Sequence, residues 1–380
     1  MSGTDAFTKD LQEHRSYFPA LGNKAYFNYG GQGVLPKQAM SAVFCSYDYV
    51  QTNGPFSAKM LHWLQDESDK TKAAFAHVLN AEAESIALTS SVTEGCNIAM
   101  WGFDWKPGDH LLMSDCEHPS IVAIAEQLAA RFGVEVGFVP LIDAQVDPVR
   151  AIADNITPKT RLVVLSHVLW NTGRMLPAKE IAAACRSKNA KLLLDGAQSA
   201  GVMPVDLTDL DCDFYAITGH KWLCGPEGVG ALYIRRELIP ELKPTYVGWR
   251  GVEALERGIN DASRFEIATA PFPLFAGLRE AVNLHNEWAP QHQRWQQVQD
   301  NVAYLRRELD KIPGTQLLWT GDCAGLVSFT VQGKTSKELM RGLENDRVML
   351  RNIPYPDCVR ASLHYLTNRR DIDRLLSAIS

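Results

Sequence analysis

An aspartate and a lysine have the types and surroundings that catalytic chemistry needs. Asp195 ends the apolar run KLLLD, where an acidic residue is costly to bury unless a cationic group faces it. Gln198 follows in DGAQSAG. Lys221 lies further along, between His220 and Trp222 in ITGHKWLCGPEGVGALYIR. Aromatic and small neighbours exclude water, which lowers the pKa of a lysine and makes its amine a nucleophile towards an aldehyde.

Together, these two residues are what pyridoxal phosphate chemistry requires. A lysine amine forms a Schiff base with the aldehyde of this cofactor, and a carboxylate keeps the pyridine nitrogen protonated as an electron sink. Each residue also has an ordinary interpretation. Asp195 would cap the turn after its strand, and Lys221 would be a solvated surface charge. The pair indicates the cofactor more strongly than either residue alone.

Two further segments fit the same cofactor. In SSVTEGCNIAMWG, the amides near Val92 and Thr93 and the Thr93 hydroxyl would cradle a phosphate at a helix N-terminus. The same letters also fit a plain helix-capping arrangement. His118, in SDCEHPS, would stack on a planar ring, although a histidine at a helix start is more often structural.

These residues follow short apolar runs that predict a sheet. Between the runs lie helical patterns at 118–132 and 177–189, which supply the crossovers of a mostly parallel sheet with helices on both faces. Ligands of such sheets bind outside the carboxyl ends of the strands, where the candidate residues lie. The fold class is therefore α/β, with predicted strands at 85–90, 110–114, 134–141, 161–166, 191–195, 213–218 and 229–235.

The pattern changes after about residue 255. Amphipathic stretches at 275–290 and 295–311, the run GLVSFTV, a helix near 335–346, the strand-like VMLRN and a last helix from about 370 predict a smaller α+β unit. A chain of 380 residues also exceeds the usual size of a single hydrophobic core. We expect a polar N-terminal arm (1–24), a large domain (25–260) and a small C-terminal domain (261–380).

Composition excludes several classes of protein. The chain has 38 Lys and Arg against 44 Asp and Glu, a net charge of −6 that is unfavourable for nucleic acid or an anionic membrane. No apolar run approaches the length of a membrane span, and the N-terminus does not resemble a signal peptide. The eight cysteines are scattered without a CxxC pair, so the sequence predicts no metal site and free thiols in a reducing compartment. We therefore expect a cytoplasmic protein. The cysteines are Cys45, Cys96, Cys116, Cys185, Cys212, Cys224, Cys323 and Cys358.

The motifs in combination resemble the aminotransferase class V enzymes of fold-type I, the pyridoxal phosphate group that contains the cysteine desulfurases. The resemblance covers nearly the whole chain. It implies a seven-stranded, mostly parallel sheet and an obligate homodimer with shared active sites. It rests on TEG (93–95), CEHPS (116–120), LSHVLWNTG (165–173), LLLDGAQSAG (192–201), TGHKWLCGPEGVGALY (218–233), RFEIATAP (264–271) and CVRASLHY (358–365).

The resemblance also implies roles for individual residues. Lys221 would be the Schiff-base lysine, Asp195 the partner of the pyridine nitrogen and Gln198 a donor to the ring hydroxyl. His118 would stack on the ring, and Arg360 would bind the substrate carboxylate bidentately. Phosphate-binding residues would be Thr93, Thr218 and His220, with Thr269 reaching the site of the neighbouring subunit.

Departures from the desulfurase pattern narrow the function. Desulfurases carry a reactive cysteine on a loop before CRAS, but here eight residues separate Arg351 from Arg360. Cys358 lies two positions before Arg360, where packing is more plausible than attack. Trp170 stands where desulfurases have a substrate-contacting asparagine, with Asn171 beside it.

Together with NYGGQGVLP, QTNGPFS and TYVGWR, these departures resemble the cystine carbon–sulfur lyase branch. This branch converts cystine to pyruvate, ammonia and cysteine persulfide, a sulfur source for iron–sulfur cluster assembly. Lys221 would act as the base, and Arg351 would anchor the distal carboxylate or else pair with Asp357. Alternatives are cysteine desulfuration, transamination or epimerisation on the same cofactor, and a non-enzymatic scaffold. An iron–sulfur apoprotein is the expected sulfur acceptor.

Overall fold

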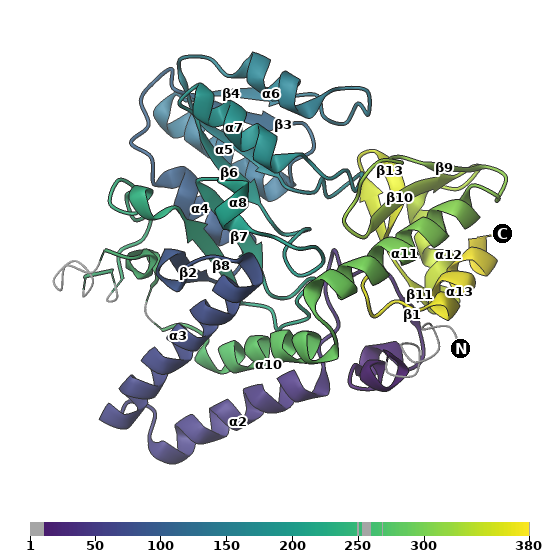
Figure 1. Cartoon of the computed structure of the whole chain (residues 1–380), viewed down its shortest axis with the longest axis horizontal. Coiled ribbons are helices and arrows are strands. Elements are labelled where there is room, and N and C mark those ends of the chain that lie inside the picture. Colours follow the sequence, from purple (N-terminus) through teal and green to yellow (C-terminus); the bar gives the residue numbers. More distant parts are fainter. Residues whose placement is uncertain (1–10, 249–250, 253–259, 268, 380) are drawn as a thin grey trace.

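Seven strands form one large sheet in the order β2-β8-β7-β6-β5-β3-β4 (Figure 1). The computed structural model describes residues 11–248, 251–252, 260–267 and 269–379. Only β8 runs antiparallel to its neighbours in this sheet. The strands are β2 (Ile86–Thr89), β3 (His110–Ser114), β4 (Glu135–Val139), β5 (Thr160–Ser166), β6 (Lys191–Asp195), β7 (Phe214–Thr218) and β8 (Gly230–Ile234).

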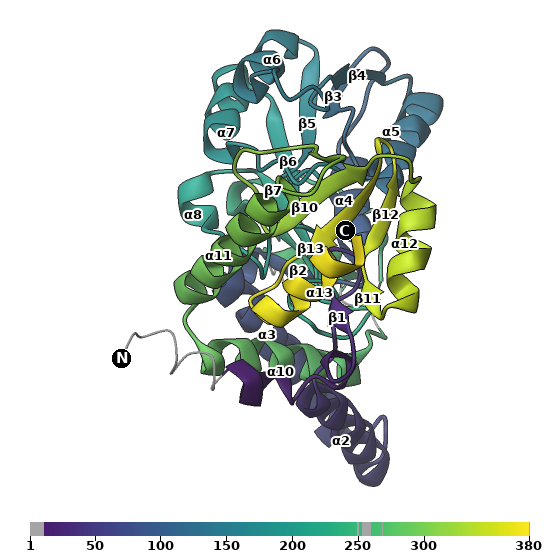
Figure 2. The ribbon, with the colours of Figure 1, turned by 90° about the vertical axis from the view of Figure 1, so that its right-hand side faces the viewer.

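Helices cover both faces of this sheet. Along β5, Leu162 and Val164 enter one apolar cluster while Val163 and Leu165 enter another, as the two-residue period of a strand requires. Residues of α4 (Val92–Trp101) and α5 (Pro119–Phe132) complete the first cluster, and residues of α6 (Pro148–Asn155) and α7 (Ala178–Ser187) the second. A short helix, α8 (Leu207–Leu210), precedes β7. Figure 2 shows α5 on one side of the strands and α6 and α7 on the other.

Three long helices lie below this sheet in Figure 1. They are α2 (Lys37–Asn53), α3 (Ala58–Leu79) and α10 (Phe272–Trp288), and α10 packs along both of the others. The far ends of α2 and α3 project beyond the rest of the chain (Figure 1). Because α10 packs on helices of the large unit, its packing favours a boundary after this helix; the division at residue 260 stays a prediction.

The C-terminal part carries an antiparallel sheet in the order β12-β13-β10-β9. Its strands are β9 (Thr315–Leu317), β10 (Leu326–Val331), β12 (Arg351–Pro354) and β13 (Asp357–Ser362). Helices α11 (Gln291–Leu309) and α12 (Ser336–Asn345) contact this sheet, and α13 (Arg369–Ile379) packs against both helices. From the N-terminal end, β1 (Ala25–Tyr26) pairs in parallel with β11 (Val348–Met349).

The predicted fold class is confirmed. All seven predicted strand segments lie in the large sheet, and the C-terminal unit is α+β. The prediction of one strand-like run at VMLRN is only partly correct. The run is divided between β11, which pairs with β1, and β12, which pairs with β13. The described part of the predicted polar arm is also packed, because Leu11, Phe18 and Leu21 are buried. No helix within the described ranges has the length and apolar character to cross a membrane.

Candidate active site

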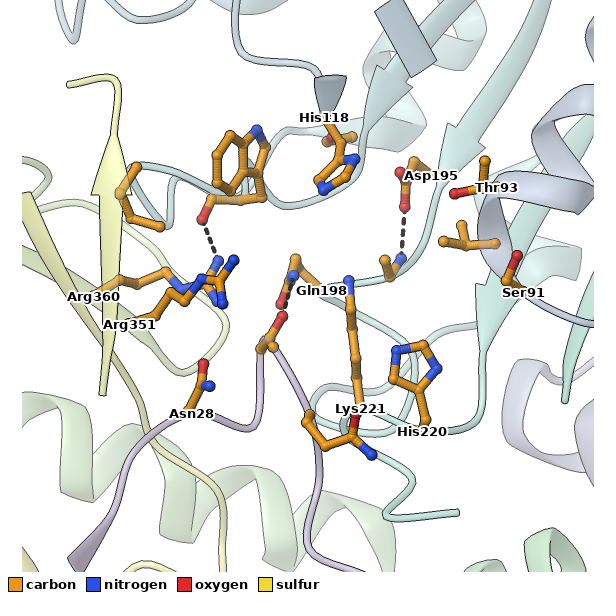
Figure 3. A pocket seen from close by; sticks show the side chains of 18 residues that line it. Asn28, Ser91, Thr93, His118, Asp195, Gln198, His220, Lys221, Arg351 and Arg360 are labelled. Atoms are coloured by element: carbon orange, nitrogen blue, oxygen red, sulfur yellow. Dashed lines mark hydrogen bonds between the residues drawn. The ribbon is translucent and has the colours of Figure 1, made fainter. Parts of the chain in front are cut away.

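A cavity of about 410 Å³ lies where the large sheet meets the β12–β13 hairpin (Figure 3). Ser166 and Asp195, which end the paired strands β5 and β6, reach it from the large sheet. This is the carboxyl edge at which ligands of parallel sheets bind. The cavity brings together nine of the predicted site residues: Val92, Thr93, His118, Asp195, Gln198, His220, Lys221, Arg351 and Arg360.

Lys221 enters the cavity from the loop between β7 and β8 (Figure 3). Desolvation lowers the pKa of its amine to about 8, the negative charge of Asp195 raises it, and the charge of Arg360 lowers it. No ion pair to this amine occurs among the residues that the structure describes. The amine can therefore lose its proton near neutral pH, as the sequence predicted from its surroundings.

The loop that carries Lys221 is fixed by segments from both ends of the chain. The amide of Gly33 donates to the carbonyl of His220 at 2.6 Å, and a Cβ at Gly33 would lie 2.0 Å from the Lys221 carbonyl oxygen. On the other side, His364 Nε2 donates to the Trp222 carbonyl at 3.1 Å. Only glycine permits the first of these close approaches.

His285 holds Leu223, which follows Trp222 in this loop. Its Nε2 donates to the Leu223 carbonyl at 3.0 Å, so its Nδ1 accepts from the Tyr365 hydroxyl at 2.5 Å. Cys224 also lies close to His285 and His364. However, both ring nitrogens of each histidine already have hydrogen-bond partners, which makes this cluster a structural support for the loop.

Asp195 is buried beside the lysine. One carboxylate oxygen, Oδ1, accepts from the amide of Ala197 at 2.8 Å. Burial raises the pKa of the carboxyl, whereas the nearby charge of Lys221 lowers it. No cation within salt-bridge distance of Asp195 occurs in the described ranges. A buried acid of this kind is suited to a cationic group that arrives with a ligand.

The start of α4 offers donors to an anion. Ser91 caps this helix by accepting from the amide of Glu94, so the capping interpretation is correct. The amides of Val92 and Thr93 nevertheless have no acceptor in the part of the chain that the structure describes. The first turn of a helix with unsatisfied amides is suited to a phosphate. Capping and phosphate binding are therefore compatible here.

His220 faces this helix start from the lysine loop (Figure 3). Its Nδ1 is hydrogen-bonded to the Thr218 hydroxyl at 2.7 Å. Thr218 itself is buried and does not line the cavity, so the structure places it behind His220. We expect any contribution of Thr218 to phosphate binding to pass through the orientation of His220.

Gln198 joins three segments under the cavity. Its Nε2 donates to the Gly30 carbonyl at 2.8 Å, and its Oε1 accepts from the indole of Trp222 at 3.0 Å. The second hydrogen on Nε2 is left for a ligand, as its predicted donor role requires.

His118 caps α5 and lies edge-on to Trp170 at 5.5 Å. Burial is the main cause of its lowered pKa, which favours the neutral ring.

Arg360 and Arg351 approach the cavity from the β12–β13 hairpin, where they are directly opposite each other in the antiparallel register. Arg360 is buried. It donates from Nη1 to the Trp170 carbonyl at 2.7 Å, and its Nε has no partner. Burial, reinforced by the charge of Arg351, lowers the pKa of Arg360 to about 10. The alternative pairing of Arg351 with Asp357 is not formed, since Asp357 accepts from the Ser336 hydroxyl instead.

These groups fit pyridoxal phosphate. A buried carboxylate, a lysine with a lowered pKa, unsatisfied helix amides and a histidine surround one space of suitable size. Thr269 lies elsewhere: it is exposed, has a φ of 66° and lines a separate hollow beside Ser90 and Glu94. Its predicted contact with a neighbouring subunit stays a prediction, as do the roles of the other site residues.

Sequence reasoning did not assign several lining residues. Gly30 and Gly31 could have been found, because a glycine run in NYGGQG signals close backbone approach. Asn171 does not line the cavity; its amide donates to the Tyr355 carbonyl at 3.3 Å, while Trp170 faces the ligand space. The unassigned lining residues are Asn28, Gly30, Gly31, Gln32, Ser91, Ser166, Trp170, Ala197 and Ile353.

The reactivity of Lys221 should depend on pH in a way that its neighbours control. In cofactor-free protein, reductive methylation of Lys221 should be half-maximal near pH 8, because the neutral amine forms as pH rises through its pKa. Asp195→Asn should move this midpoint down and Arg360→Gln should move it up. Mass spectrometry of the Lys221 peptide, with the exposed Lys70 peptide as reference, measures both shifts. A midpoint that neither variant moves would contradict this electrostatic account.

Comparison with known proteins gives the same family as the motifs. Residues 25–375 match the family described as aminotransferase class-V. Two solved structures of C-DES are each 43% identical to this chain, and in both cases the match covers 98% of the C-DES chain. One is a complex of the cystine C–S lyase C-DES with its reaction product cysteine persulfide (95% of this chain, TM-score 0.92). The other is a lysine-to-alanine mutant with glycine covalently linked to the pyridoxal phosphate cofactor (96%, TM-score 0.93).

Curated relatives carry other activities. The chain is 29% identical to isopenicillin N epimerase of Streptomyces clavuligerus, over 93% of each chain. It is 27% identical to a cysteine desulfurase of Haloferax volcanii, over 93% of this chain and 88% of the relative. The resemblance in the motifs is thereby confirmed, and the protein belongs to the aminotransferase class-V family.

Proposed function

We propose that this protein is a pyridoxal phosphate-dependent carbon–sulfur lyase that converts cystine to pyruvate, ammonia and cysteine persulfide. The observation that carries the proposal is the pair of arginines at opposed positions of the β12–β13 hairpin, beside Lys221. The similarity to C-DES, a cystine C–S lyase, supports it.

The arginine pair selects for a substrate with two anionic groups. Like charges at directly opposed strand positions destabilise a sheet. Within the described residues, no carboxylate is close enough to form an ion pair with Arg351 or Arg360. Cystine has an α-carboxylate at each end and would neutralise both guanidinium groups. We assign the carboxylate of the reacting half to buried Arg360 and that of the distal half to Arg351.

The position of the cysteines favours a lyase over a desulfurase. No cysteine lines the cavity as described. Cys358 is buried on β13, and desolvation raises the pKa of its thiol to about 12, which suppresses the nucleophilic thiolate. Cys45 is exposed, but it lies on α2. The sulfur would therefore leave with the product instead of being transferred to an enzyme thiol.

The residues of the chain would act as follows. When bound, pyridoxal phosphate supplies an electron sink for the charge that develops at the substrate α-carbon. Asp195 holds a proton at the ring nitrogen, and Arg360 orients the α-carbon–hydrogen bond by gripping the carboxylate. Lys221 Nζ takes the α-proton. The β-carbon–sulfur bond then breaks, its electron pair leaves with the persulfide sulfur, and water converts the three-carbon remainder to pyruvate and ammonia.

Other reactions on the same cofactor remain the second candidate. Desulfuration of cysteine to alanine, transamination and epimerisation would all use Lys221 and Asp195. Because the relatives of this chain include a cysteine desulfurase and an epimerase, the product analysis also tests for these reactions. A non-enzymatic scaffold is the weakest alternative, because the lysine and its partners are all present in one cavity.

We also propose a homodimer. Large apolar side chains are exposed where α2 and α3 project, with Phe44 73% and Phe56 89% accessible and Tyr47 and Leu61 also exposed. Apolar surface of this kind is typical of a protein interface. Thr269 lies outside the cavity of its own chain, which is consistent with the predicted contact across subunits.

The sulfur product and the location complete the proposal. All eight cysteines are unpaired, which is typical of a reducing compartment such as the cytoplasm. Persulfide released into solution would supply an iron–sulfur apoprotein. Cluster assembly on an apo-ferredoxin with cystine as the sulfur source tests this acceptor, and failure with persulfide demonstrably present would reject it.

The first experiment is product analysis. Purified holoenzyme should produce pyruvate and persulfide from cystine and little alanine from cysteine, because no cavity thiol accepts sulfur. Lactate dehydrogenase coupling measures pyruvate, and amino-acid analysis measures alanine. A Lys221→Ala variant, which lacks the base, serves as the control. Alanine as the main product would instead identify a desulfurase.

Arg351→Ala should raise KM for cystine about tenfold, the typical effect of losing one charge-assisted hydrogen bond. The mixed disulfide of cysteine and cysteamine keeps the disulfide but lacks the distal carboxylate, so its KM should barely change. Arg341→Ala removes an exposed arginine of α12 and is the matched control. Equal losses for both substrates would reject the distal-carboxylate role.

The wild-type protein should elute at twice the 42.2 kDa of one chain in size-exclusion chromatography with light scattering. A Phe44→Asp/Phe56→Asp double variant places charges in the apolar face and should give monomers. Phe138→Asp, at an exposed position of β4, is the control and should remain dimeric. Dimers in the double variant would show that this face is not the interface.

A further inference from the structure

A second cavity, of about 310 Å³, lies next to the loop that carries Lys221. It is formed by the end of α3, the connection between α10 and α11, and Leu223 of the lysine loop. It shares no lining residue with the active-site cavity. Nothing in the proposed reaction uses this space.

Arg294 of α11 gives this cavity a buried positive charge. Its side chain is more than nine-tenths buried, with 7% of the residue exposed. Nη1 donates to the carbonyls of His285 and Ala289 at 2.8 and 2.6 Å and to Asn286 Oδ1 at 3.0 Å. These bonds cap the C-terminal end of α10, and they occupy only one of the three guanidinium nitrogens.

The rest of the guanidinium group lacks a counter-charge. Nε and Nη2 donate to no acceptor in the portion of the chain with described structure. No acidic side chain there forms an ion pair with Arg294, and burial lowers its pKa. Helix capping explains Nη1 but leaves two free donors of a mostly buried cation in the wall of a cavity, where solvent still reaches them. An anion would stabilise this arrangement.

The other walls define what kind of anion fits. Val78, Leu223, Val282 and Pro290 provide apolar surface. His77, Asn286 and Gln291 line other parts of the cavity, and the Gln291 amide already donates to the Met203 carbonyl. One cation beside apolar surface matches a carboxylate with a short hydrocarbon body better than it matches phosphate or sulfate.

We propose that this cavity binds a small aliphatic monocarboxylate, with the carboxylate on Nε and Nη2 of Arg294 and the hydrocarbon against Val78, Val282 and Leu223. The ligand would contact Leu223, whose carbonyl His285 holds, two residues after Lys221. It would therefore contact the lysine loop outside the active-site cavity.

Isothermal titration of the holoenzyme with 3-methylbutanoate tests the proposal. Because the active site also holds two arginines, the titration is made in an Arg351→Ala/Arg360→Gln background, which removes both carboxylate subsites proposed there. One equivalent per chain should still bind. The isosteric amide, 3-methylbutanamide, has no charge and should bind at least tenfold more weakly.

Substitutions then show where the remaining equivalent of 3-methylbutanoate binds. Arg294→Gln should weaken the binding of 3-methylbutanoate at least tenfold. Val282→Phe keeps the arginine but fills the cavity, and it should have the same effect, so the test does not depend on one variant folding. Arg306→Gln is the matched control, since Arg306 also donates to three carbonyls but lies outside this cavity. It should leave binding unchanged.

Two results would overturn the inference. The first is that no carboxylate binds once Arg351 and Arg360 are both replaced, and the second is that binding persists unchanged in Arg294→Gln or Val282→Phe. Neither readout involves turnover, so a failure here is distinguishable from a failure of the proposed lyase activity.

Discussion

The rest of this structure depends on three charged side chains that lack ion-pair partners among the described residues. Two of them are buried and the third, a lysine, is half-buried. Asp195, Lys221 and Arg360 converge on one cavity, and desolvation opposes the ionised form of each. Such a group is tolerated only where neighbouring dipoles and charges compensate part of the cost. The Ala197 amide provides this for Asp195, and the Trp170 carbonyl provides it for Arg360. A cofactor and a substrate with two carboxylates would supply the remaining compensation.

The architecture divides the work between two sheets. The large parallel sheet brings Asp195 and Ser166 to one edge because β5 and β6 pair in register there. The antiparallel hairpin delivers both arginines from one short segment, since Arg351 and Arg360 are register partners. The groups that we propose for the cofactor thus come mainly from the large sheet, and the two arginines that we propose for the substrate come from the hairpin.

Much of this arrangement could be predicted from the sequence, and the reasons are physical. Strands such as β5 and β6 are short, almost wholly buried runs, so their composition identifies them. Asp195 and Lys221 stood out because a charge in apolar surroundings is costly. By contrast, Asn28 and Ile353 line the cavity through tertiary packing, which leaves no local signal. The division of VMLRN also depends on pairing with β1, far away in sequence, and the position of Thr218 behind His220 depends on side-chain geometry.

The lysine loop is fixed by residues from both ends of the chain. Gly33 meets it from the N-terminal side, and His364 holds it from the C-terminal side. During synthesis, the large sheet can assemble as soon as its own strands have emerged from the ribosome. Lys221 cannot reach its final environment until the segment from Arg360 to His364 has also emerged. We therefore expect cofactor capture by the complete site to wait until the segment that contains His364 has been synthesised.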